Sequence, residues 1–227
     1  MIEVVKVLDR ITANERSHDI LKGIVDGQTL LALSGGASPD YRKMIVEPAD
    51  LVPGAICLAD ERYGAPSHDD SNEILIRNSG LVDFLEVRNV KFYKILRGEE
   101  FEKTAQDYRK VISELFSQFP KKVGIMGIGV DSHTAGIFAG SAACASADLV
   151  VAETIEDRFP KRITLTIRAL EQFNFFVILA FGEEKREALT KLFDENENDL
   201  VKYPAIFYRK SSAKSYLITD LDIGPKS

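Results

Sequence analysis

The chain has 227 residues, 45% of them hydrophobic, and carries a formal net charge of -6 at pH 7. This length and hydrophobic content predict that residues 1–227 form a single domain with a complete core. The acidic balance and the scattered Lys and Arg residues argue against nucleic acid or an anionic membrane as a partner, because both need concentrated positive charge. A small anionic substrate is compatible with this composition, since a local basic pocket can form on an acidic protein.

The cysteines and the start of the chain indicate its cellular setting. Cys57 lies in an apolar run and Cys144 in an alanine-rich stretch, which fits neither a disulfide framework nor a metal site, so both are expected to be free thiols. Residues 1–6 lack the features of a signal peptide, and no run approaches ~18 apolar residues. We therefore expect a soluble, cytoplasmic protein. The sequence leaves its oligomeric state open, and a monomer is compatible with it.

Short apolar runs alternate with segments of helical periodicity along the chain. Strands are predicted at 4–8, 30–33, 55–59, 90–95, 123–126, 149–152, 163–167, 175–181, 205–207 and 215–219. Helices are predicted at 14–25, from Ser38-Pro39 onward, at 71–78, at 100–119 and from 182 to 193. This alternation predicts an α/β fold, a three-layer, open, mainly parallel sheet with helices on both faces, Rossmann-like in architecture.

The most informative segment is the glycine-rich loop 127–134, Gly-Ile-Gly-Val-Asp-Ser-His-Thr, which follows the apolar run 123–126. A buried strand that ends in such a loop is typical of the ligand-binding edge of an open α/β sheet. The loop supplies an acid at Asp131, a hydroxyl at Ser132 and an imidazole at His133. Taken alone, the same residues also fit a solvated turn, because Gly, Asp and Ser favour turns.

Two further loops favour a binding site over a turn. Loop 33–39, Leu-Ser-Gly-Gly-Ala-Ser-Pro, closes the run 30–33, and loop 60–63, Asp-Glu-Arg-Tyr, closes the run 55–59. The carboxyl ends of parallel strands meet at one edge of a sheet, so these three loops are expected to converge.

The motifs in these loops also occur together in a known family. They are Leu33-Ser34-Gly35-Gly36 with Pro39, Asp60-Glu61-Arg62 with His68 and Asp70-Ser71-Asn72, Gly127-Ile128-Gly129 with Asp131 and His133-Thr134-Ala135, Arg162-Ile163-Thr164-Leu165-Thr166, and Gly182 with Lys185. In this order the set resembles the 6-phosphogluconolactonases, in the superfamily they share with the glucosamine-6-phosphate deaminases. The form of the second motif is similar to the lactonase branch.

The resemblance implies a NagB/lactonase-type fold and a hydrolase that converts 6-phosphogluconolactone to 6-phosphogluconate in the pentose phosphate pathway, without metal or cofactor. A lactone is an activated ester, so the enzyme needs a base to deprotonate water, donors for the oxyanion and a grip on the phosphate. His133 is the candidate general base, because imidazole accepts a proton at neutral pH. Asp131 is expected to orient the ring or stabilise the imidazolium.

The phosphate of the substrate is expected to meet a second set of residues. The hydroxyl and backbone N–H groups of the glycine-rich loop provide donors near a helix N-terminus, and cationic side chains provide charge. The residues are Ser34, Gly35, Gly36, Arg62, Arg162 and Lys185. As single residues, the cations would more often be surface groups or partners of nearby acids.

Three positions depart from the family pattern. Ser132 stands where the family usually has glycine, so its side chain narrows the site or strains the loop if the backbone there needs a positive φ. Residues 137–139 read Ile-Phe-Ala where Leu-Phe-Pro is common, and Arg168 stands where a proline often follows the Thr-Leu-Thr segment. The substrate is therefore less firmly implied than the fold.

Other functions remain open at this point. An amino-sugar-phosphate isomerase or deaminase needs a second acid, and the deaminases carry a glutamate five residues after the histidine, where this chain has Phe138. A noncatalytic sugar-phosphate-binding protein is also compatible, chiefly because of Ser132. A dinucleotide-binding domain would use Gly127-x-Gly129 with Asp148, but it would put the acid of the loop against a pyrophosphate.

Two other chemistries fit less well. A triad of Ser34, His133 and Asp131 lacks the nucleophile-elbow pattern. A metal site at His68 with its two following aspartates is disfavoured, because adjacent residues rarely face one ion and no second ligand cluster completes it. A polar loop that folds over the site is the preferred interpretation of His68.

Overall fold

The computed structural model describes residues 1–36, 38–47 and 50–224. Its centre is a parallel sheet of seven strands in the order β1-β10-β9-β6-β2-β3-β5. The strands are β1 (Ile2–Lys6), β2 (Thr29–Leu33), β3 (Ala55–Leu58), β5 (Lys91–Tyr93), β6 (Lys121–Gly127), β9 (Phe175–Leu179) and β10 (Lys214–Thr219). Every residue of β2 and β3 is buried, as expected for parallel strands covered on both faces.

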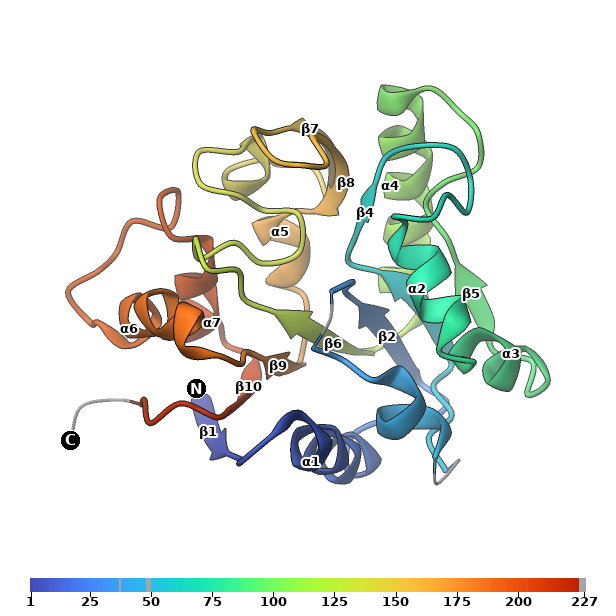
Figure 1. Ribbon diagram of the computed structural model, residues 1–227. Coiled ribbons are helices and arrows are strands. Elements are labelled where there is room, and N and C mark those ends of the chain that lie inside the picture. The colour runs from blue at the N-terminus through green and yellow to red at the C-terminus, as the bar shows by residue number, and fades with distance from the viewer. Residues whose placement is uncertain (37, 48–49, 225–227) are drawn as a thin grey trace.

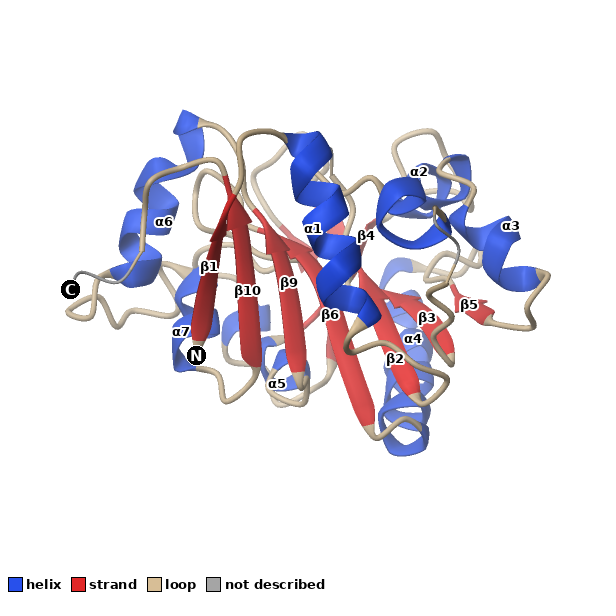
Figure 2. Ribbon diagram, turned by 90° about the horizontal axis from the view of Figure 1, so that it is seen from below, coloured by secondary structure: helices blue, strands red, loops and turns tan. Residues whose placement is uncertain are grey.

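Helices cover both faces of this sheet, as predicted. Figure 2 shows α1 (Arg10–Lys22) crossing one face and α4 (Phe101–Gln118) lying behind the other. The remaining helices are α2 (Asn72–Asn78), α3 (Leu81–Glu86), α5 (Ile167–Leu170), α6 (Arg186–Phe193) and α7 (Phe207–Lys210). The three-layer α/β architecture expected from the sequence is confirmed, and within the described part of the chain no helix is long and apolar enough to cross a membrane.

A second, smaller sheet was not predicted. It pairs β4 (Asp60–Arg62), β8 (Lys161–Leu165) and β7 (Val150–Thr154) in antiparallel fashion. It lies above the end of the parallel sheet in Figure 1 and is joined to it where the Leu165 N–H donates to the Ala59 carbonyl at 2.8 Å. This sheet adds one wall to the edge where the parallel strands end.

Several predicted elements need correction. Residues 205–207 form no strand but the 3-10 turn Pro204–Ile206 leading into α7, because Pro204 occupies the first helical position and has no N–H for a ladder. The helix expected from Ser38-Pro39 is instead a short π-helical segment, Arg42–Val46. The strand expected at 163–167 ends at Leu165, because the Thr166 hydroxyl caps α5 by accepting from the Ala169 N–H.

Candidate active site

The loops after three neighbouring strands meet in one cavity. β6 lies between β2 and β9. From β2 the chain continues to β3 on one side, whereas from β6 it continues to β9 on the other side. The carboxyl ends of β2 and β6 therefore form the topological switch point of the sheet. The cavity there has a volume of about 400 Å³. Every predicted site residue except Asp131 lines it: Ser34, Gly35, Gly36, Arg62, His133, Arg162 and Lys185.

Asp131 lies behind His133 rather than on the cavity wall. Its Oδ1 is 2.6 Å from Nδ1 of the imidazole and also accepts the His133 backbone N–H at 3.2 Å. A carboxylate only accepts hydrogen bonds, so Nδ1 carries the hydrogen and Nε2 is the basic nitrogen of the neutral ring. Burial raises the pKa of Asp131, but the hydrogen bonds and charge of His133 outweigh it, and the net pKa is below the ordinary value.

The dyad occupies space that only a glycine leaves free. A Cβ on Gly129 would lie 2.1 Å from Nδ1 of His133 and 2.5 Å from Oδ1 of Asp131. The Gly129 N–H donates to the His133 carbonyl at 2.8 Å, which closes the loop on itself. The glycine of the sequence motif is therefore required by close approach of the two functional side chains.

Ser132 has the backbone strain that the departure from glycine suggested. Its φ is +71°, in the left-handed region that favours glycine. Its side chain is buried, and Oγ finds no hydrogen-bond partner among the described residues. It does not line the cavity, so Ser132 strains the loop without narrowing the site.

The glycine-rich loop after β2 forms another part of the cavity wall. Ser34 continues the sheet through its N–H, which donates to the Ile125 carbonyl at 3.0 Å, and its own carbonyl accepts the Tyr41 hydroxyl. The Ser34 Oγ is buried and unpartnered within the described parts of the chain, so Ser34 and His133 form no hydrogen bond and no triad. A Cβ on Gly35 would lie 1.8 Å from Oδ1 of Asn72, whose amide therefore packs against the loop.

Arg62 and Arg162 lie directly opposite each other on β4 and β8. Like charges in such a pair are unfavourable unless nearby groups compensate them. Arg162 is buried and contacts Asp157 at 2.7 Å and the buried Asp60 at 3.5 Å. Arg62 donates through Nη1 to the Asp70 carbonyl at 2.8 Å, and it makes no ion pair within the described residues. Arg162 is thus charge-compensated, whereas the positive charge of Arg62 in the cavity has no ion-pair partner among the described residues.

Lys185 completes the cationic side of the cavity from a third strand. It follows β9 through Gly182, whose φ of +92° requires glycine, and it immediately precedes α6 as the sequence predicted. Burial lowers the pKa of the Lys185 amine. No carboxylate of the described chain lies within ion-pair distance of it, so a second cation faces the cavity without a close anionic partner.

The turn between β7 and β8 contributes cavity residues that the sequence analysis missed. Asp157, Arg158 and Phe159 line the cavity, and the Phe159 ring lies 4.9 Å from the guanidinium carbon of Arg62. No motif marks this turn, because the residues reach the site only when β8 pairs with β4. Asn72, by contrast, belonged to a motif that the sequence analysis noted without giving it a role.

Glu61 and His68 support the site from outside the cavity. The carboxylate of Glu61 is buried and accepts the backbone N–H groups of Asn72 and Glu73 at the start of α2, at 2.6 and 2.8 Å. His68 donates through Nε2 to the Arg62 carbonyl at 2.9 Å. Its loop therefore packs against β4, and His68 does not line the cavity. Within the described ranges, no group of three histidine, cysteine or acidic residues is placed to hold a metal ion.

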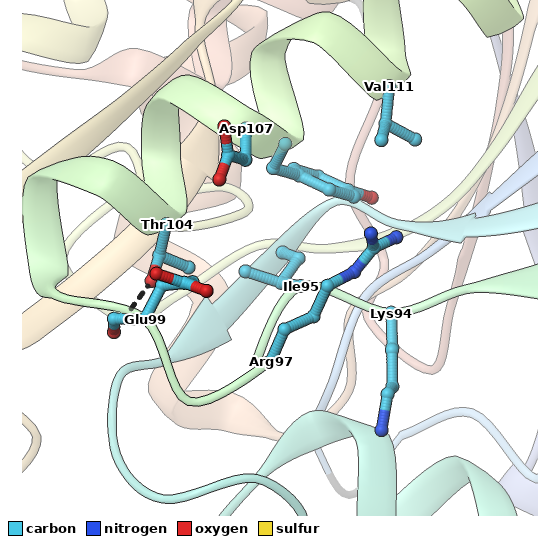
Figure 3. A pocket seen from close by; sticks show the side chains of 8 residues that line it. Lys94, Ile95, Arg97, Glu99, Thr104, Asp107 and Val111 are labelled. Atoms are coloured by element: carbon cyan, nitrogen blue, oxygen red, sulfur yellow. Dashed lines mark hydrogen bonds between the residues drawn. The ribbon is translucent and has the colours of Figure 1, made fainter.

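Other hollows fit a sugar phosphate less well. One of about 400 Å³ beside α7 has Lys210 as the only cation among its lining residues, and no glycine-rich loop reaches it. The cavity in Figure 3, lined by Ile95, Arg97 and Tyr108 among others, has a volume of only about 20 Å³, room for about one water molecule. A groove of about 540 Å³ beside α4 contains Arg109, but this side chain is paired with Asp148 at 2.9 Å, and no glycine-rich loop reaches it. The cavity at the switch point is therefore the candidate active site.

Comparison with known proteins agrees with this fold. The family model for glucosamine-6-phosphate isomerases/6-phosphogluconolactonase matches residues 7–217. The fold is that of an open, parallel α/β protein, and the family match shows that the chain belongs to this family. The resemblance drawn from the sequence motifs is confirmed.

Individual relatives span nearly the whole chain. A 6-phosphogluconolactonase of Nostoc sp. is 28% identical over 234 residues, covering 96% of each chain, and one of Helicobacter pylori is 30% identical over 178 residues, or 74% of each chain. A solved 6-phosphogluconolactonase from Leishmania guyanensis has a TM-score of 0.80 at 20% identity over 96% of each chain. A monomeric glucosamine-6-phosphate deaminase has a TM-score of 0.79 at 17% identity, over 96% of this chain and 97% of its own. The two structures therefore establish the fold and not the reaction.

The structure does not fit the dinucleotide-binding alternative. Its fingerprint needs a helix directly after the glycine-rich loop, so that the pyrophosphate meets the helix N-terminus. After β6 the described chain continues as a loop to the short 3-10 turn Ala142–Cys144.

Proposed function

We propose that this protein hydrolyses 6-phosphogluconolactone to 6-phosphogluconate, with His133 as the general base. The observation that carries the proposal is the Asp131–His133 contact of 2.6 Å at the wall of a cavity that also contains Arg62 and Lys185. A base and a set of cations in one cavity suit a substrate with a reactive carbonyl at one end and a phosphate at the other. The names of the relatives support the same substrate.

The hydrolysis begins at Nε2 of His133. This nitrogen removes a proton from water as the water oxygen attacks the lactone carbonyl carbon. The imidazolium that forms is stabilised by Asp131, which is ionised at neutral pH because its pKa is low. When the tetrahedral intermediate collapses, the bond between the carbonyl carbon and the ring oxygen breaks, and the ring oxygen takes the proton from the imidazolium. The product is the open-chain acid, and His133 returns to its neutral form.

The phosphate would be bound by the loop 34–36 together with Arg62 and Lys185. The buried Oγ of Ser34 and the N–H groups of the two glycines supply donors, and the two cations supply charge-assisted hydrogen bonds. Arg162 adds positive charge to the same cavity, but most of it is shared with Asp60 and Asp157. We therefore assign Arg162 a smaller part in phosphate binding than Arg62 and Lys185.

The apolar side chain at Phe138 favours hydrolysis over deamination. Its ring is stacked on the His133 imidazole, so no second acid follows the base at this position of the loop. Sugar-ring opening and proton shuttling need such an acid, whereas lactone hydrolysis needs no second acid, because the protonated base supplies the proton to the leaving oxygen.

The test is hydrolysis of freshly prepared 6-phosphogluconolactone at neutral pH, with the acid product coupled to its dehydrogenase. Wild type, His133→Asn and an enzyme-free blank are measured together, because the lactone also opens spontaneously. We expect rapid wild-type turnover and a loss of roughly 10² or more in kcat for the variant. A wild-type rate equal to the blank would refute the proposal, and amino-sugar phosphates would then be tested as substrates and as simple ligands.

A further inference from the structure

The ring of Phe138 lies flat against the catalytic imidazole. The ring centroids of Phe138 and His133 are 4.3 Å apart, and their planes differ by 26°. The contact follows from a tight turn, in which Thr134 and Ile137 form an antiparallel bridge and the Ile137 N–H donates to the Thr134 carbonyl at 2.9 Å. The residues that flank such a bridge lie side by side, so residues 133 and 138 meet face to face.

The turn that carries Phe138 is anchored on three sides. The Thr134 hydroxyl donates to the Gly127 carbonyl at 3.0 Å and lies 2.6 Å from the buried Tyr208 hydroxyl. The Gly136 N–H donates to Oγ1 of Thr164 on β8 at 3.0 Å. Because both sheets hold the turn, the Phe138 ring is a fixed surface rather than a mobile one.

The hydrogen bond to Asp131 alone does not fix the imidazole. It holds Nδ1, but rotation about the outer side-chain bond of histidine has a broad energy minimum, so Nε2 can still swing. A flat neighbour on one face of the ring removes that freedom. A π face also stabilises the imidazolium that forms during the reaction.

We propose that Phe138 is a positioning residue, which holds the His133 ring so that Nδ1 meets Asp131 while Nε2 faces the cavity. This inference rests on the proposed role of His133 as base. The other charged groups around the imidazole are Asp131, Asp60, Asp157, Arg162 and Lys185. The guanidinium carbon of Arg162 also lies 5.6 Å from the centroid of the Phe138 ring. A change in the pH profile therefore reports loss of the aromatic face, through the imidazole and through Arg162 together.

The experiment compares Phe138→Leu with Phe138→Tyr. The leucine variant keeps the apolar bulk and loses the flat face, whereas the tyrosine variant keeps the face. For Phe138→Leu we expect kcat to fall about tenfold with KM within about twofold, and the acid limb of the kcat/KM profile to move down by about 0.5 pH unit. Phe138→Tyr should stay within about twofold of wild type. Phe84→Leu, on α3, is the control for loss of an aromatic ring and should leave kcat and KM unchanged.

A second measurement does not depend on turnover. Histidine ¹⁵N NMR of the substrate-free protein should show a single Nδ1–H tautomer for His133 in wild type and Phe138→Tyr, and averaged or broadened ring signals in Phe138→Leu. If wild type proves inactive on the lactone, the proposed function fails while these spectra still decide the role of Phe138. A leucine variant with wild-type kcat and unchanged ring signals overturns the inference. So does a rise in KM alone, which would make Phe138 part of the substrate wall.

Discussion

The imidazole of His133 lies where a side chain on Gly129 would have to be. A Cβ at that position would come within 2.1 Å of Nδ1 and 2.5 Å of Oδ1 of Asp131. A Cβ does not approach non-bonded atoms this closely, so any residue other than glycine at 129 must displace Asp131 and His133. The contact between Asp131 and His133 therefore depends on a residue that has no side chain of its own.

Gly129→Ala should consequently abolish most activity. We expect kcat to fall by about 10² or more, because a displacement of about 1 Å is enough for a loss of that size. Steady-state kinetics on the lactone would measure it, with far-ultraviolet circular dichroism as the check on folding. Gly27→Ala is the matched control, since a Cβ there meets nothing within 4 Å. A folded Gly129→Ala protein with wild-type kcat would show that the loop simply moves aside.

Ser132→Gly should stabilise the protein. Glycine relieves the positive φ at this position and removes a buried hydroxyl without a partner, although it also adds disorder to the unfolded chain. We expect a net gain of about 1 kcal/mol in the free energy of unfolding, measured by urea denaturation. Ser132→Ala removes the hydroxyl and keeps the strain, so the glycine variant should be the more stable of the two. The reverse order would show that the left-handed backbone costs little here.

Lys185→Ala should weaken substrate binding more than turnover. A charge-assisted hydrogen bond to phosphate is worth about 1.5 to 3 kcal/mol, so KM should rise roughly 10-fold to 100-fold with kcat within about threefold. Lys191→Ala is the control, because Lys191 lies on α6 and pairs with Glu197 instead of facing the cavity. Lower kcat with unchanged KM in Lys185→Ala would place the amine in the chemical step.

Arg162→Ala should destabilise the fold as well as the site. The substitution leaves the buried carboxylate of Asp60 without its closest cation and frees the turn at Asp157. Removing one partner of a buried ion pair typically costs about 3 to 5 kcal/mol, so the variant should unfold at clearly lower urea concentration. The double variant Arg162→Ala with Asp60→Asn should recover part of this loss. No recovery would mean that Asp60 is not the group left unpaired.

The stability of the protein should depend on pH through Glu61. Burial raises the pKa of Glu61 to about 7 against the lowering effect of its backbone N–H donors, while the unfolded chain titrates near 4.5. Between these values the folded protein keeps a proton that the unfolded chain releases. The free energy of unfolding therefore falls as pH rises through this window, by up to about 3 kcal/mol.

Urea denaturation at pH 5, 6, 7 and 8 measures this dependence. In Glu61→Gln the group cannot titrate, so the decline between pH 5 and pH 7 should be smaller than in wild type by most of that amount. Burial also raises the pKa of Asp60, and this contribution has the same sign but is common to both proteins. Equal slopes in the two proteins would show that Glu61 is ionised throughout.

The sequence by itself determined the parallel sheet and the loop that contains Asp131 and His133. Apolar runs such as 30–33 and 123–126 indicate buried strands when glycine-rich loops close them, and parallel strands bring those loops to one edge. The motif containing Asp131 and His133 is local, so two residues of spacing suffice to place acid and base together. Ser132 was marked as a source of strain for the same reason, since a positive φ is a property of one residue.

Only the tertiary structure decided which groups compensate one another across the site. In the small antiparallel sheet, β4 and β8 lie about 100 residues apart in the sequence. Their pairing brings Arg162 to Asp60 and the unmarked turn at Phe159 to Arg62. Composition and periodicity do not predict such contacts, because the contacts depend on the register in which two distant strands pair. The sequence could therefore identify Arg62, Arg162 and Lys185 but not Arg158. It also could not show that Arg162 is charge-compensated while Lys185 has no close anionic partner among the described residues.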